Sequence, residues 1–304
     1  MRIAVTGASG FIGGAVATAL ADEDHEVVGF GRRPDGWTHP RAAYRVWDLD
    51  AGPVRGDREF EAVVHCAALA DDWAPRDVAL RVNRDGTRTV ARTFPDARIV
   101  HLSTSSVYDA FVPSVEVQEW QAPVRRFLST YSESKTLAEF ELAGTDAVIL
   151  RPHAVYGPGD TTLLPRLLAG VRRGRLVLPE GAEVRHSLTR IDNLVQAVRR
   201  ALDPASPRGT YNIADARPVQ LAAVLREFFD RRGVRAKLVR LPYRSAFALA
   251  GALEAAARTS GRRPRITRYA VSQLGLERTL DITAARERLG YDPAPTSLEG
   301  AETW

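Results

Sequence analysis

Apolar, β-branched segments alternate with amphipathic ones through the first half of the chain, and this order limits the folds open to it. Six segments have the composition of buried strands: 2–7, 25–30, 42–49, 61–68, 97–104 and 146–152. Helical spacing of apolar residues marks 11–22, 75–94 and 129–143. Nearly continuous apolar strands that alternate with helices form a parallel sheet covered on both faces. We therefore predict an α/β fold with a doubly wound parallel sheet.

The alternation becomes less regular after Pro152. Residues 162–174 and 190–202 are predicted helices, and 209–214 is a candidate for one more strand. The remainder is predicted to be mainly helical, with a short strand at 237–241.

Composition excludes several kinds of protein. Cys66 is the only cysteine of the 304 residues, so the chain forms no internal disulfide and no paired-cysteine metal site, and we expect no metal. The 42 Lys and Arg outnumber the 37 Asp and Glu, but they are scattered, and we expect no nucleic-acid partner. The apolar stretch 245–257 is too short for a bilayer and contains Glu254, and no secretion signal is evident. We expect a cytoplasmic protein without a membrane partner.

A glycine-rich turn, TGASGFIG, follows the first predicted strand. Gly7, Gly10 and Gly13 have G-x-x-G-x-x-G spacing between a strand and a helix, which is the context of a dinucleotide site. In such a turn the glycines permit the tight bend, the approach of a pyrophosphate and close helix packing. The predicted cofactor contacts in this turn are Gly7, Ser9, Gly10, Phe11 and Ile12. The fold is then of the Rossmann type.

The end of the second strand bears on the choice of cofactor. An acidic residue there usually binds the adenosine ribose of NAD. This chain has Gly31 instead, followed by Arg32 and Arg33, whose guanidinium groups can pair with a 2′-phosphate. We therefore predict NADP, with NAD less favoured.

The glycine turn also suggests a division into domains. Residues 1–160, with a return segment of about 187–215, are predicted to form the NADP-binding domain. Residues 161–186 and 216–304 are predicted to form a smaller, mainly helical substrate-binding domain.

Lysine is rare in this arginine-rich chain. The only lysines are Lys135 and Lys237, so the lysine of YSESK stands out, although a single retained lysine can also arise by chance. Tyr131 and Lys135 are four residues apart, which places them on one helix face about 6 Å apart along the axis. An ammonium is a compact charge that a planar guanidinium does not replace.

Several motifs occur together in the order of a known family. They are the glycine turn, HCAAL (65–69), VNRDGT (82–87), STSSVY (103–108), YSESK (131–135), RPHAVYGPGD (151–160) and LDITAARERLGYDP (280–293). Together they resemble the extended short-chain dehydrogenases/reductases, the NAD(P)-dependent epimerase/dehydratase family. Within it, the chain looks most like the 3β-hydroxysteroid-dehydrogenase-like branch.

The resemblance implies a catalytic site. Tyr131 would pass the proton to or from a substrate oxygen, and Lys135 would bind the nicotinamide ribose. We expect the ammonium of Lys135 to lower the pKa of Tyr131 toward working pH. Thr104 would hold the carbonyl oxygen, with Ser105 as the fallback.

The resemblance also implies further cofactor contacts. These are Asp48 and Leu49 at the adenine, Ala67 and Ala68 in the groove, and Pro152 and His153 beside the nicotinamide, in addition to Tyr131 and Lys135. Asn83 matches a structural asparagine. His153 could serve as a catalytic acid or, in the reading we favour, pack and orient its neighbours.

Some positions differ from the family's motifs, and these differences bear on which reaction and substrate to expect. Dehydratases carry Asp-Glu after the threonine, where this chain has Ser105 and Ser106, so dehydration is not expected. Ala154 replaces an asparagine that contacts nucleotide sugars, whereas Arg185 falls where many such enzymes bind a diphosphate. Candidate substrate residues are Ser105, Trp73 and Arg185, although Arg185 equally suits an ordinary surface position.

We predict an NADP-dependent enzyme that interconverts a ketone and a secondary alcohol on a small-molecule substrate. The alternative is a nucleotide-sugar epimerase or 4-ketoreductase. A non-enzymatic alternative is an NADP-binding regulatory protein, which would usually have a damaged Tyr/Lys pair. By resemblance, helices 75–94 and 129–143 would pair with their copies in a homodimer.

Overall fold

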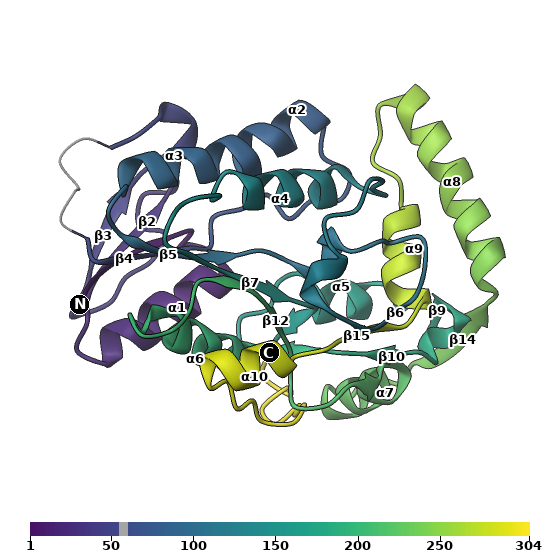
Figure 1. The fold of residues 1–304 in the computed structure, drawn as a ribbon. Helices are drawn as coiled ribbons and strands as arrows, with labels where there is room; N and C mark the ends of the chain where they lie inside the picture. Colours follow the sequence, from purple (N-terminus) through teal and green to yellow (C-terminus); the bar gives the residue numbers. More distant parts are fainter. Residues whose placement is uncertain (55–59) are drawn as a thin grey trace.

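A seven-stranded parallel sheet forms the centre of the computed structural model, which describes residues 1–54 and 60–304 (Figure 1). In spatial order the strands are β12 (Gly209–Ile213), β7 (Ala147–Pro152), β5 (Arg98–Leu102), β4 (Ala62–His65), β1 (Arg2–Thr6), β2 (Glu26–Gly31) and β3 (Ala43–Val46). The predicted doubly wound sheet is confirmed, and the candidate strand 209–214 is its edge strand.

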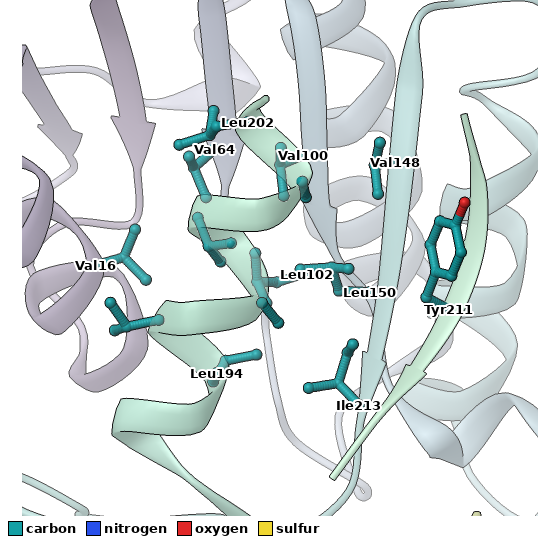
Figure 2. Packing of buried hydrophobic residues seen from close by; sticks show 14 of the residues in the cluster. Val16, Val64, Val100, Leu102, Val148, Leu150, Leu194, Leu202, Tyr211 and Ile213 are labelled. Atoms are coloured by element: carbon teal, nitrogen blue, oxygen red, sulfur yellow. The ribbon is translucent and has the colours of Figure 1, made fainter. Parts of the chain in front are cut away.

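Helices cover both faces of this sheet. One face carries α1 (Phe11–Asp22) and α6 (Ile191–Leu202), and the other carries α2 (Arg76–Ala79), α3 (Gly86–Thr93) and α4 (Thr130–Phe140) (Figure 1). Side chains from α1, α6 and the strands interlock in the largest core. Figure 2 labels part of it: Val16, Val64, Val100, Leu102, Val148, Leu150, Leu194, Leu202, Tyr211 and Ile213.

The predicted helix 75–94 is helical but not uniform. A π-helical segment, Leu80–Asp85, lies between α2 and α3. Its Asn83 side chain is turned inward, where it accepts from Leu69 N at 2.7 Å and donates to Ser134 Oγ at 2.8 Å. The Thr87 hydroxyl donates to the Asn83 carbonyl at 2.7 Å. Asn83 therefore ties the loop after β4 to α4, as a structural asparagine would.

The second half of the chain is less regular than predicted. The helix expected over 162–174 is only α5 (Leu164–Ala169), and the strand β9 (Arg175–Pro179) follows it and pairs with β14 (Lys237–Leu241). A small sheet, which the sequence did not predict, contains β13 (Val219–Gln220), β10 (Arg185–His186), β15 (Arg278–Leu280) and β6 (Ser114–Val117). A strand pair, β8 (Val155–Tyr156) and β11 (Thr189–Arg190), was also missed. These strands are too short to show a period in the sequence.

Helices α7 (Leu221–Arg231), α8 (Tyr243–Ser260), α9 (Arg268–Gly275) and α10 (Thr283–Leu289) complete the fold. Leu280, Ala285, Leu289 and Tyr291 belong to the core of the large sheet. This last segment therefore packs with the larger unit, although the sequence analysis assigned it to the smaller one. In residues 1–54 and 60–304, no helix is long and apolar enough to cross a membrane.

Candidate active site

A groove of about 330 Å³ lies at the carboxyl ends of β1, β2 and β4. Nine of the predicted cofactor residues line it: Gly7, Ser9, Gly10, Arg32, Arg33, Asp48, Leu49, Ala67 and Ala68. Trp47 and Cys66, which the sequence analysis did not assign to the cofactor, also line it. Doubly wound sheets bind ligands at this edge.

The glycines of the turn are needed for close packing. Gly7 has a φ of 73°, and a Cβ there would lie 2.7 Å from the Ala67 nitrogen. A Cβ on Gly13 would lie 2.2 Å from the Gly7 carbonyl oxygen. Side chains at these positions would push α1 away from β1 and β4. Phe11 and Ile12 pack against the large core, and the groove lining does not include them.

The structure gives a steric reason for Gly31. A Cβ on Gly31 would lie 2.5 Å from Tyr44 Oη and 2.9 Å from Ser9 Oγ, so an acidic side chain does not fit without displacing them. Tyr44 donates to the Arg33 carbonyl at 2.7 Å, and the Arg33 guanidinium donates to the Ser9 carbonyl at 2.5 Å. Arg32 and Arg33 are exposed at the groove. The groove therefore has two guanidinium groups at the end of β2 that can pair with an anionic group.

Lys135 is buried beneath the carboxyl end of β5. Its side chain extends from α4 and is 2% exposed. Nζ donates to the Leu102 carbonyl at 2.7 Å and lies 3.2 Å from His101 Nε2. Burial lowers the pKa of Lys135 to about 8. The amine therefore gains or loses its proton at a pH slightly above neutral.

Tyr131 lies one turn before Lys135 on α4, which Ser129 caps by accepting from Ser132 N at 3.1 Å. Burial raises the pKa of Tyr131, and the side chain of Thr104 opposes that rise. The expected lowering of this pKa by Lys135 is not found. The i, i+4 spacing places both residues on one face, but Nζ bonds to the Leu102 carbonyl and is not directed at the phenol.

Thr104 begins a chain of hydroxyl groups. Its hydroxyl donates to Ser106 Oγ at 3.1 Å, and Ser106 N donates back to Thr104 Oγ1 at 3.1 Å. Ser106 Oγ lies 2.6 Å from the hydroxyl of Tyr269, on α9. The hydroxyl groups of Thr104, Ser106 and Tyr269 are thus connected.

Ser105 belongs to a second, separate chain. Its hydroxyl lies 2.7 Å from His153 Nδ1, and His153 Nε2 lies 3.2 Å from His186 Nδ1. Burial lowers the pKa of His153 to about 3 and that of His186 well below its usual value. Both rings are therefore neutral at pH 7, which favours an orienting role for His153. Pro152 precedes it as the last residue of β7.

The loop after β4 approaches the C-terminal helices. Arg258 of α8 lies over the Trp73 ring at 5.6 Å, and Arg263 pairs with Asp71 at 2.6 Å. Thr267 donates to Asp72. These contacts place Trp73 beside α8.

Arg185 is not brought together with the other predicted site residues. Its side chain is 49% exposed and lies 3.7 Å from Glu277. The next residue of β10, His186, is buried and contacts His153. Side chains alternate along a strand, so Arg185 points away from that contact.

Three residues near the site were missed in the sequence: His101, His186 and Tyr269. His101 lies within a predicted strand, and its contact with Lys135 depends on how α4 packs on that strand. Tyr269 is 163 residues from Ser106, and no local pattern marks it.

Lys135→Arg should lower turnover by at least about tenfold. The ammonium of Lys135 donates to one carbonyl, that of Leu102, and a planar guanidinium does not match this single acceptor. The larger group would also displace the buried side chains around it. Wild-type activity should fall as the pH rises through about 8, because Lys135 then loses its proton. The variant should show no such fall. Steady-state rates across this pH range measure both effects. An equally active variant would mean that the rare lysine is there by chance.

The sequence model of the NAD dependent epimerase/dehydratase family matches residues 3–214. A relative from Stigmatella aurantiaca, a 4-hydroxy-2-methyl-3-oxo-4-farnesyl-3,4-dihydroquinoline-1-oxide ketoreductase, is 29% identical over 99% of this chain and 95% of its own. A 2-alkyl-3-oxoalkanoate reductase of Shewanella oneidensis is 30% identical over 97% of this chain and 83% of its own.

The 3β-hydroxysteroid-dehydrogenase-like resemblance is confirmed as well. A 3-beta-hydroxysteroid dehydrogenase of Mycolicibacterium neoaurum is 26% identical over 97% of this chain and 88% of its own. Among solved structures, UDP-glucuronic acid 4-epimerase from Bacillus cereus in complex with NAD has a TM-score of 0.74 at 21% identity, covering 99% of this chain and 96% of its own. At that identity the structural similarity supports the fold alone.

Proposed function

Because the chain belongs to the NAD dependent epimerase/dehydratase family, we propose that it is an NADP-dependent oxidoreductase that interconverts a ketone and a secondary alcohol. The observation that carries the proposal is that α4 holds Tyr131 one turn before Lys135, whose buried amine donates to the carbonyl of Leu102, two residues before Thr104. Two relatives with ketone-reducing names, similar over nearly the whole chain, support a net redox reaction.

The reaction requires a proton donor and a second hydrogen bond at the carbonyl oxygen. When bound, the nicotinamide supplies the hydride to the carbonyl carbon or removes it from the alcohol. In reduction, Tyr131 gives its proton to the carbonyl oxygen, and the Thr104 hydroxyl donates a hydrogen bond to the same oxygen. Burial keeps Tyr131 protonated at neutral pH, which is the form that reduction needs.

The positions that would carry out elimination of water are otherwise engaged. Ser105 contacts His153, and Ser106 contacts Tyr269. Neither serine acts as an acid or base near neutral pH. These contacts support reduction or oxidation over dehydration.

The groove residues fit NADP. Arg32 and Arg33 would hold the 2′-phosphate, and the glycine turn with the start of α1 would hold the pyrophosphate. Lys135 would anchor the ribose next to the nicotinamide. His153 would orient Ser105 beside the substrate, and Trp73 would line the substrate side.

The proposal can be tested with a panel of ketones, including 3-oxoalkanoates, and a panel of nucleotide sugars, each followed by NADPH absorbance. We expect NADPH consumption with at least one ketone. Conversion of a nucleotide sugar without net loss of cofactor would show the epimerase alternative. NADPH binding without turnover of any compound would favour a regulatory protein.

We also propose a homodimer. Helices α2, α3 and α4 lie on the same face of the sheet (Figure 1), and Arg88 of α3 pairs with Glu141 at the end of α4 at 2.6 Å. Phe140, 55% exposed on this face, would be covered by a second copy. Light scattering at micromolar concentration should give twice the chain mass, and a monomer there would contradict the proposal.

A further inference from the structure

Tyr269 reaches the catalytic hydroxyl groups from the C-terminal part of the chain. Its hydroxyl lies 2.6 Å from Ser106 Oγ, which in turn lies 3.1 Å from Thr104 Oγ1. Burial raises the pKa of Tyr131, and the side chain of Thr104 lowers it. No step of the proposed reaction uses Tyr269 or Ser106 directly. Their hydrogen bonds to each other and to Thr104 therefore need a separate explanation.

The substrate oxygen and Ser106 compete for the one proton of the Thr104 hydroxyl. A threonine hydroxyl has one proton. Thr104 Oγ1 lies 3.1 Å from Ser106 Oγ, so Thr104 can give that proton to Ser106 instead of to a substrate. A Thr104 hydroxyl that donates to Ser106 cannot donate at the same time to a substrate oxygen. During the reaction the Thr104–Ser106 bond must therefore have Ser106 as its donor and Thr104 as its acceptor.

Tyr269 can set that direction. A phenol is a stronger acid than an aliphatic hydroxyl and gives its hydrogen bond more readily. When Tyr269 donates to Ser106 Oγ, Ser106 can turn its own proton toward Thr104 Oγ1. Thr104 already accepts from Ser106 N and has a second lone pair for this bond. The Thr104 proton is then free for the substrate oxygen.

We propose that Tyr269 is a positioning residue, which through Ser106 orients the Thr104 hydroxyl so that its proton points at the substrate oxygen. This inference rests on the proposed function, because it assigns Thr104 to the carbonyl oxygen.

The surroundings of Tyr269 hold it in place. Thr267 caps α9 by accepting from Ala270 N at 3.0 Å, and it also donates to Asp72 in the loop after β4. Arg268 pairs with the buried Glu254 of α8 at 2.8 Å. The two residues that precede Tyr269, Thr267 and Arg268, are thus fixed to other elements. The orientation of Thr104 consequently depends on how α9 is docked against the sheet domain.

The test uses four variants of the full chain. Tyr269→Phe should lower kcat by about tenfold, the value of one hydrogen bond to the reacting oxygen, with NADPH affinity unchanged. Ser106→Ala should lower kcat less, by about threefold, because Thr104 then has no competing acceptor. The double variant should recover from the Tyr269→Phe level to the Ser106→Ala level. The control is Tyr243→Phe, which removes a phenol hydroxyl from α8, where the Tyr243 ring lies 5.6 Å from that of Phe247; it should behave like the wild type.

A second measurement does not depend on turnover. In ¹³C-tyrosine NMR titrations, with Tyr131 assigned by Tyr131→Phe, Tyr269→Phe should raise the pKa of Tyr131, because Thr104 then donates to Ser106. Ser106→Ala on that background should reverse the rise. An unchanged pKa of Tyr131 in Tyr269→Phe, or a double variant no more active than Tyr269→Phe, would overturn the inference. Failure of the wild type to reduce any ketone would instead count against the proposed function, and the titration would still decide the role of Tyr269.

Discussion

Replacing Tyr131 with phenylalanine should lower turnover by about 10²–10⁴-fold, the range for the loss of one acid–base group. The buried ring is kept, while the hydroxyl that carries the transferable proton is lost. NADPH binding should be nearly unchanged, because the glycine turn, Arg32 and Arg33 line the cofactor groove and Tyr131 is not among its lining residues. Stopped-flow or steady-state rates combined with fluorescence titration of NADPH separate the two effects.

A matched control for this variant is Tyr156→Phe. Tyr156 is also buried, and its hydroxyl donates to Asp215 at 2.9 Å, away from the hydroxyl chain. We expect this control to keep its turnover at temperatures where it stays folded. Near-normal turnover in Tyr131→Phe would remove Tyr131 from the mechanism.

Replacing Arg32 and Arg33 together with alanine should abolish most of the preference for NADPH. The wild type should bind NADPH at least about tenfold more tightly than NADH, because a charge-assisted contact to the 2′-phosphate contributes roughly 1.5–3 kcal/mol. Both arginines are exposed at the groove, so added salt should weaken the preference. The variant should bind NADH about as well as the wild type does.

Fluorescence titration of both cofactors measures this preference directly. A useful control is Arg45→Ala, which removes an exposed arginine of the neighbouring strand β3 that is not part of the groove lining. It should leave the ratio of the two affinities unchanged. Equal affinities in the wild type, or tighter NADH, would contradict the NADP assignment and favour an epimerase that retains NAD.

The sequence predicted most of what depends on local order. The first strand, the glycine turn and α1 are contiguous, and their packing needs no distant partner beyond β2 and β4. The groove residues followed, because parallel strands end at a common edge. The sequence showed that Gly31 stands where NAD enzymes usually have an acidic residue. Only the structure shows that Tyr44 and Ser9 leave no space for a side chain there.

What the sequence could not supply depends on distant pairs. Strand β15 pairs with β6, and both are short and lie far apart in the chain, so no periodicity marked them. Tyr269 and His186 reach the site from the C-terminal half for the same reason. The expected effect of Lys135 on Tyr131 was wrong because spacing fixes a helix face but not the direction of a long side chain.

The central claim is a net transfer of hydride between NADPH and a ketone, with the proton supplied by this chain. NADPH that carries deuterium at both C4 positions tests it most directly, by mass spectrometry of the product from whichever ketone the panel identifies. We predict one deuterium on the carbinol carbon for each NADPH oxidised, at a rate reduced in Tyr131→Phe. Interconversion of a nucleotide sugar with no deuterium gained and no NADPH consumed would contradict the account.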